Sequence, residues 1–174
     1  MDYKSLCYKL VANIDVGEVA YSFTPYRPHL AEGGFVYEVP AMSTCGMMIS
    51  RELYDYIGGW PTELGIYGGG EPFINFTLAT MGMSKHIFVS PPLTHHGNKR
   101  GYSWNFDDHV RNKCIATYMY GGKDFALTMM RHNKGNQDVL MKIYADVLEK
   151  CKPHRELIKP KQVISIQDWV KKWQ

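Results

Sequence analysis

The sequence predicts an α/β fold in which a small mixed sheet is flanked by helices and followed by a helical C-terminal extension. Short apolar runs bounded by glycine or proline have the length of strands. Between them lie segments that begin at a capping residue and end at glycine, which is typical of helices. After residue 124 only helical patterns remain, so we expect one part at residues 1–124 and the extension at residues 125–174.

Residues 1–60 are expected to combine short strands with one short helix. Strand-like segments cover Lys9 to Ile14 and Gly34 to Val39, on either side of the Pro- and aromatic-rich loop YSFTPYRPHL. The apolar run AMSTCGMMIS, residues 41–50, also has strand length. The segment SRELYDYIGGW then predicts a helix that Ser50 caps and two glycines end.

A glycine-rich stretch leads into the next helix and strand. The segment EPFINFTLATMG predicts a helix with Pro72 in its first turn, where the first amides have no helical partner, and with Gly82 beyond its end. The segment KHIFVSPP, Lys85 to Pro92, predicts a strand that two prolines end. The polar segment LTHHGNKRGYSW predicts a loop.

Helical patterns occupy the rest of the chain. Phe106 to Tyr120 predicts a helix closed by two glycines. Two further helices are expected at Phe125 to Arg131 and at Gln137 to Lys150. Residues 153–174 are expected to form a basic tail with an amphipathic end, IQDWVKKWQ.

Composition and charge narrow the classes of function. The net charge is only +3, which argues against nucleic acid as a partner. The four cysteines form no CxxC pair, so they are predicted to be reduced thiols. We find no signal peptide or membrane span in the sequence and expect a cytoplasmic location. The 12 Tyr and 4 Trp are typical of sugar or nucleotide surfaces, or equally of core packing.

The stretch GIYGGGEPFINF places three glycines directly before Glu71. Glycine permits positive φ and the close approach of a ligand, because no Cβ is in the way. At the start of a helix the macrodipole favours the ionised carboxylate. Such a carboxylate can accept hydrogen bonds from sugar hydroxyls or take a proton. The alternative is a purely structural loop with an acidic helix start.

The segment HHGNKRGYSW contains residue types suited to a metal and a phosphorylated ligand. One of two adjacent histidines can ligate a divalent metal, basic side chains can neutralise phosphates, and aromatic rings can stack on a ligand. The alternative is a solvated basic loop with two ordinary histidines. The residues concerned are His95, His96, Lys99, Arg100, Tyr102 and Trp104.

The order of these features resembles the C-terminal half of a GT-A fold glycosyltransferase. Between Val39 and Tyr120 the sequence has a strand-like run with Cys-Gly, then Ile-Gly-Gly-Trp, Gly-Gly-Glu at a helix start, a strand, and a histidine followed by basic residues. The resemblance is nearest to polypeptide N-acetylgalactosaminyltransferases, β-1,4-galactosyltransferases and bacterial family-2 enzymes. It implies a nucleotide-sugar donor and a glycan or protein acceptor.

The resemblance also implies roles for single residues on the acceptor side. In these families the Gly-Gly-Glu segment, here Gly69, Gly70 and Glu71, contacts the acceptor or supplies the base. The next position is Asp or Asn in many members, but it is Pro72 here, and proline cannot act as a base. Trp60 resembles the acceptor-side aromatic residues of these families.

On the donor side, these families use a histidine after the following strand to ligate Mn²⁺ or Mg²⁺, together with an upstream Asp-x-Asp or Asp-x-His. His96 fits this position better than His95, and Lys99 to Trp104 would close over the nucleotide diphosphate. The family's nucleotide-binding half is missing before Val39, so we expect a fragment or a natural half-protein. Its remaining metal ligands would lie elsewhere, and its incomplete sheet edge could support self-association.

The sequence thus predicts a metal-dependent glycosyltransferase, or a fragment of one, that transfers a hexose or N-acetylhexosamine to an acceptor hydroxyl. Glu71 would orient that hydroxyl. A non-catalytic carbohydrate-binding or assembly module is the alternative, which Pro72 and the missing Asp-x-Asp favour. A mononuclear metal enzyme that uses some of the seven histidines is a third hypothesis, although no HExxH motif is present.

Overall fold

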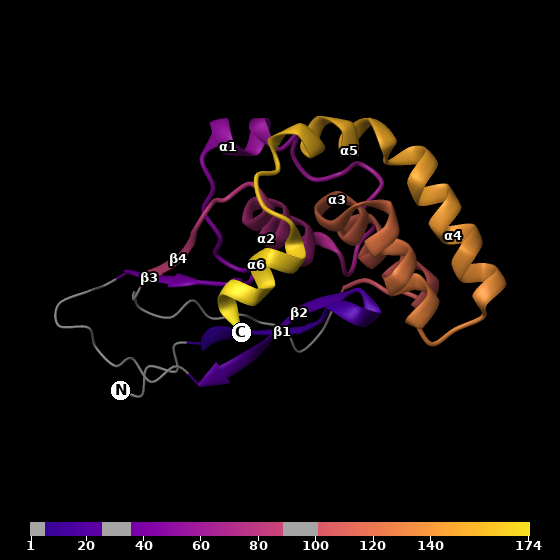
Figure 1. Ribbon diagram of the computed structural model, residues 1–174, viewed down its shortest axis with the longest axis horizontal. Coiled ribbons are helices and arrows are strands. Elements are labelled where there is room, and N and C mark those ends of the chain that lie inside the picture. Colours follow the sequence, from indigo (N-terminus) through magenta and orange to yellow (C-terminus); the bar gives the residue numbers. More distant parts are fainter. Residues whose placement is uncertain (1–5, 26–35, 89–100) are drawn as a thin grey trace.

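The computed structural model describes residues 6–25, 36–88 and 101–174, which form a mixed α/β fold with more helix than strand (Figure 1). The expected α/β class is confirmed. Within the described residues the strands form two antiparallel pairs, β1-β2 and β3-β4, in place of one mixed sheet. The elements are β1 (Leu6–Asn13), β2 (Glu18–Pro25), β3 (Val36–Val39), α1 (Arg51–Tyr56), α2 (Gly70–Thr80), β4 (Lys85–Phe88), α3 (Phe106–His132), α4 (Gln137–Lys150), α5 (Lys152–Ile158) and α6 (Ile166–Trp173), with short 3₁₀ turns η1 (Ile14–Val16) and η2 (Lys159–Lys161).

The first strand pair is a long hairpin. Its register runs from Asn13 opposite Glu18 at the turn to Leu6 opposite Pro25 at the open end. The strand expected near Lys9 is confirmed, but part of the expected aromatic loop is strand β2. Val19 and Tyr21 alternate with less apolar neighbours, a period-two pattern that the nearby prolines obscure.

The segment between β3 and α1 is irregular, so the strand predicted at residues 41–50 is wrong. Gly46 has a φ of 74°, which breaks an extended run, and Met48 is 83% exposed. The polar groups of this segment bond to helix α2: Met42 exchanges backbone hydrogen bonds of 2.8 and 2.7 Å with the side chain of Asn75. The backbone groups of Met42 therefore bond to a side chain of α2 and not to a neighbouring strand.

Helix α2 lies at the centre of the molecule (Figure 1), and every residue from Phe73 to Thr80 is buried. Its prediction is confirmed, as is that of the short helix α1, in which Ser50 accepts a hydrogen bond from the Leu53 amide. Because α2 is covered on all sides, it provides a fixed support for the residues at its N-terminus.

Helix α3 packs against α2 and is interrupted at Gly122, which has φ 82° and ψ −179°. The predicted helix end at this point is therefore confirmed, and a second helical stretch continues to His132. The interruption leaves carbonyls without helical partners. Gln162 compensates, because its side-chain amide donates to the carbonyls of Met119 and Tyr120, at 3.3 and 3.0 Å.

The C-terminal segment is helical, as expected, but it is not a loose basic tail. Ile158 of α5 and Val170 of α6 have no exposed surface, and Trp169 of α6 packs edge-on against Phe76 of α2. The hydrophobic core is continuous across residue 124. None of the helices in the described part of the chain combines the length and the apolar character that a membrane crossing requires.

Candidate functional site

Glu71 lies in the first turn of α2, where a ring of donors surrounds its carboxylate. Oε1 accepts hydrogen bonds from the Ser43 hydroxyl at 2.9 Å, the Thr44 amide at 2.9 Å and the Thr44 hydroxyl at 3.2 Å. Oε2 accepts a hydrogen bond from the Tyr21 hydroxyl of β2. The carboxylate therefore joins the β1-β2 hairpin and the irregular segment after β3 to the start of the central helix.

These contacts keep Glu71 ionised. Partial burial alone would raise the pKa of Glu71, but the hydrogen bonds from Tyr21, Thr44 and Ser43 outweigh burial, and the net shift of the pKa is downward. The positive end of the α2 dipole acts in the same direction. A carboxylate with a lowered pKa is a weak proton acceptor and a good hydrogen-bond acceptor.

The glycines before Glu71 serve close packing against α3. Gly68 and Gly69 both have positive φ, 81° and 77°. A Cβ on Gly69 would lie 2.2 Å from the backbone oxygen of Asn112, and one on Gly68 would lie 2.5 Å from the His109 ring. The open floor expected for a ligand is thus occupied by α3 at these two glycines. Gly70 differs, because the nearest atom to its added Cβ is the Trp60 ring nitrogen, at 3.4 Å.

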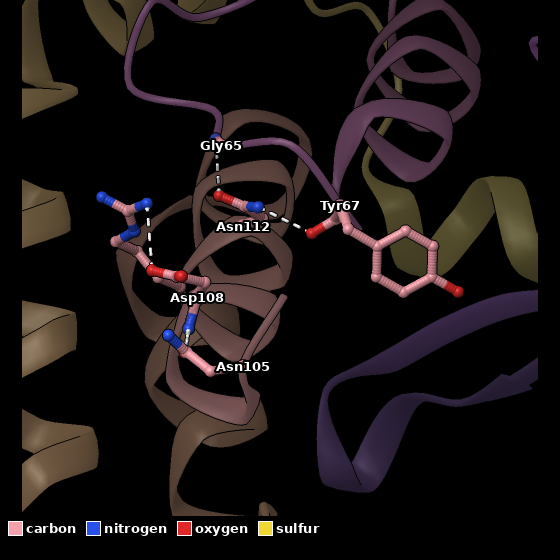
Figure 2. Close-up of polar contacts among 6 residues, drawn as sticks. Gly65, Tyr67, Asn105, Asp108 and Asn112 are labelled. Carbon is pink, nitrogen blue, oxygen red and sulfur yellow. Dashed lines mark hydrogen bonds and ion pairs between the residues drawn. The ribbon is translucent and has the colours of Figure 1, made fainter. Parts of the chain in front are cut away.

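Asn112 fixes the path of this glycine-rich loop. Its buried side chain accepts from the Gly65 amide at 2.9 Å and donates to the Tyr67 carbonyl at 2.7 Å. Figure 2 shows Asn112 between these two backbone groups, with the ring of Tyr67 turned away from it. The helix carrying Asn112 is itself capped by Asn105, whose side chain accepts from the Asp108 amide at 2.8 Å. The loop is therefore held at two backbone points by one side chain.

Aromatic rings gather beside the loop. Tyr67 lies 4.8 Å from Trp104, 6.4 Å from Tyr102 and 5.4 Å from the stacked ring of His109, between ring centroids. Tyr102 and Trp104 remain 41% and 45% exposed. Burial, with the nearby charge of Lys113, lowers the pKa of His109. We call Tyr67, Tyr102, Trp104 and His109 the aromatic cluster.

Trp60 contacts the residue at which the same loop meets α2. Its ring nitrogen donates to the Gly70 carbonyl at 3.3 Å, and its ring lies 5.7 Å from that of Tyr54. The structure thus brings together six of the predicted site residues around one loop. They are Trp60, Gly69, Gly70, Glu71, Tyr102 and Trp104.

The remaining predicted site residues, Lys99, Arg100 and the metal ligand His96 or His95, lie outside the described residues. Within residues 6–25, 36–88 and 101–174, no group of three or more His, Cys, Asp or Glu side chains is arranged to hold a metal ion. The metal assignment therefore stays a prediction.

The residues that position the loop and the carboxylate were not predicted from the sequence. Asn112 is fully buried, and a buried amide needs partners, so its side chain signals a contact with backbone groups. Tyr21, Ser43 and Thr44 carry no comparable signal, because they are separated from Glu71 by 27 to 50 positions in the chain.

Comparison with known proteins adds no family. No protein-family model matches the sequence, and no curated protein is significantly similar to it.

Proposed function

We propose that this chain is the acceptor-side part of a GT-A type glycosyltransferase that transfers a hexose or N-acetylhexosamine from a nucleotide sugar to an acceptor hydroxyl. The observation that carries the proposal is the ionised Glu71 carboxylate, fixed by Thr44 at the start of a helix whose preceding loop contacts Trp60 and the aromatic cluster. Aromatic rings beside a carboxylate suit a sugar, because C–H faces of sugars stack on rings while sugar hydroxyls donate to carboxylates.

In this proposal Glu71 orients the acceptor and does not remove its proton. Among the described residues Oε1 accepts three hydrogen bonds, whereas Oε2 accepts one, from Tyr21. Each carboxylate oxygen offers about two lone-pair positions, so the three donors crowd Oε1, whereas Oε2 retains one position for a substrate hydroxyl. The lowered pKa of Glu71 supports positioning over base catalysis, which is most effective when the pKa of the base lies near the working pH.

The donor side of the proposal rests on residues outside the described part of the chain. His96 would contribute to a site for Mn²⁺ or Mg²⁺, and Lys99 and Arg100 would contact the diphosphate. The cation would supply charge neutralisation for the leaving group. Tyr102 and Trp104, which already contact Tyr67, would form the base of the closing segment.

The test is a transfer assay on the complete natural polypeptide that includes this chain, with a panel of nucleotide sugars and Mn²⁺. We expect sugar transfer or donor hydrolysis that chelation abolishes. We expect His96→Ala to lower the rate sharply, by about a hundredfold or more, because the diphosphate would lose a metal ligand. The matched control is His86→Ala, at an exposed histidine of β4, which should leave the rate unchanged. A rate that is equal in His96→Ala and wild type would remove the metal role.

A non-catalytic carbohydrate-binding module is the second candidate, and the four hydrogen bonds on Glu71 favour it because they suffice to explain the residue structurally. Binding distinguishes the two functions. Glycan binding that is unchanged by Mn²⁺ and uridine diphosphate, with no turnover of any donor, would support the module and contradict the transferase.

A further inference from the structure

A pocket of about 280 Å³, whose lining does not include Glu71, lies between the turn of the β1-β2 hairpin and helix α3. The hairpin turn touches α3 closely: a Cβ on Gly17 would lie 2.5 Å from the backbone nitrogen of Met129. Val16, Val19 and Pro72 supply apolar walls. Glu71 and Tyr21 do not line the pocket, although their chain neighbours Pro72 and Ala20 do, so the two sites are adjacent but distinct.

The interruption of α3 at Gly122 shapes this pocket. Lys113, Thr117 and Tyr120 line it from one face of the first helical stretch, and Met129 and His132 line it from the second stretch. Two helical segments that change direction at a glycine with φ 82° present a concave side that one straight helix would lack. The pocket therefore follows from the same glycine pair that ends the predicted helix.

The floor of the pocket contains an incompletely used pair of hydroxyls. Thr117 Oγ1 and Tyr120 Oη are 3.2 Å apart, and both residues are only 4% exposed. Two hydroxyls have two O–H donors between them, and the bond that they share uses one. Within the described part of the chain neither makes another hydrogen bond, so one buried donor remains for a ligand oxygen.

The rim of the pocket carries opposite charges that do not pair. Glu18 offers only acceptors and Lys113 only donors, and neither forms an ion pair with another described residue. A singly charged ligand gains nothing overall from the pair, because a carboxylate is attracted by Lys113 but repelled by Glu18, and an amine is attracted by Glu18 but repelled by Lys113. A ligand without net charge whose groups both donate and accept satisfies both rim residues and the floor donor. Hydroxyl groups have this property.

We propose that this pocket binds one neutral saccharide ring, a hexose or an N-acetylhexosamine. The volume supports a single ring, because a cavity of about 150 Å³ already holds benzene and the substituents of a pyranose need more room. The apolar walls contact the C–H groups of the ring, and the polar floor and rim contact its hydroxyls. This inference does not require transferase activity, and the pocket is separate from the Glu71 carboxylate.

The experiment is a titration of the ¹⁵N-labelled chain with methyl β-glucoside and with N-acetylglucosamine, followed by ¹H–¹⁵N correlation NMR spectra. We expect at least one of them to bind in the millimolar range and to shift the amides of residues 16–20, 117–120 and 129–133. Ala20→Leu, which fills the pocket, and Thr117→Val, which removes one floor hydroxyl, should each weaken binding about tenfold or more. Ala145→Leu, at an exposed position of α4, is the matched control and should leave binding unchanged.

Three results would overturn the proposal. The first is the absence of shifts with either saccharide at about 50 mM, a concentration well above typical millimolar affinities. The second is tighter binding of hexanoate or hexylamine than of the saccharides. The third is unchanged binding in both Ala20→Leu and Thr117→Val, or shifts confined to the aromatic cluster. Pocket binding by the chain, together with no sugar transfer by the complete polypeptide, would refute the proposed transferase while leaving this inference intact.

Discussion

Replacing Lys85 with methionine tests how the central helix tolerates a buried charge. Lys85 of β4 is 4% exposed, and its ammonium donates to the Asn75 carbonyl at 3.2 Å and lies 4.9 Å from the centre of the Trp169 ring. No carboxylate among the described residues forms an ion pair with it. Burial lowers the pKa of Lys85 from 10.5 to about 8, against a smaller upward effect of Glu38.

The magnitude follows from this pKa. The gap of about 2.5 between the unfolded and folded values corresponds to about 3 kcal/mol of disfavoured charged form, at 1.36 kcal/mol for each pKa unit. The contact with Trp169 offsets about 1–2 kcal/mol of this. Because methionine fills a similar volume without charge, we expect Lys85→Met to raise the free energy of unfolding by about 1–2 kcal/mol at pH 7.

The pH dependence of the free energy of unfolding shows whether the buried charge on Lys85 causes the difference between the two proteins. A lysine whose folded pKa is lowered holds its proton more weakly in the folded state, so the unfolded state binds more protons between pH 8 and 10.5. The wild type therefore gains up to about 3 kcal/mol as pH rises through this window, which exceeds the advantage of about 1–2 kcal/mol that Lys85→Met has at pH 7, so the difference should vanish at about pH 9 and reverse above it. Buried Tyr120 and Cys114, whose pKa values are raised, oppose this trend equally in both proteins, so only the difference is informative.

The assay is urea unfolding followed by circular dichroism at pH 7, 8.5, 9.5 and 10.5. Lys172→Met, at an exposed lysine of α6, is the matched control and should change stability little at any pH. A methionine variant that is less stable than wild type at pH 7, or a difference that stays constant with pH, would refute the view that burial disfavours the charge on Lys85.

Three further predictions concern the loop before α2. Glu71→Gln should lower the free energy of unfolding at neutral pH. Because the pKa of Glu71 is lowered in the folded state, the wild type loses this advantage as pH falls below the ordinary carboxyl value of 4.5, and the two proteins should become more alike. Urea unfolding curves at pH 3 and pH 7 would show this trend. Gly69→Ala should destabilise the protein by at least about 2 kcal/mol more than Gly70→Ala in the same assay. Of these two glycines only Gly69 has a positive φ, and a Cβ there would lie 2.2 Å from the backbone oxygen of Asn112. Equal effects of the two substitutions would contradict the packing role. Asn112→Ala should cost about 2–4 kcal/mol by leaving two backbone groups of the loop unpartnered, and a loss below 1 kcal/mol would show that water replaces it.

Local signals in the sequence predicted most of the helices. The capped start of α1 at Ser50, the bounds of α4 and the break of α3 at Gly122 all depend on side chains or glycines within the same turn of chain. Such features need no knowledge of distant partners. The amphipathic end of the chain was also recognisable, although burial of Trp169 against α2 requires a surface that local patterns do not reveal.

The failures share one physical cause, which is that backbone groups found partners in distant side chains. The run at residues 41–50 looked like a strand because it is apolar, yet Asn75 and Glu71 bind its backbone and exclude a neighbouring strand. Glycines before Glu71 indicated close approach correctly, but the sequence could not tell whether a ligand or α3 approaches. Both cases were decided by tertiary contacts.

The contacts that hold Glu71 bear on both candidate functions. These contacts suffice for a structural tie, and they also leave what a residue that orients a substrate needs, which is rigidity and one open lone pair. Three donors immobilise Oε1, while Oε2 accepts from Tyr21 alone among the described residues. Immobilisation makes a hydrogen-bond acceptor more effective at orienting a substrate, whereas a lowered pKa makes a carboxylate less effective as a base. The geometry of Glu71 therefore favours substrate positioning over proton removal.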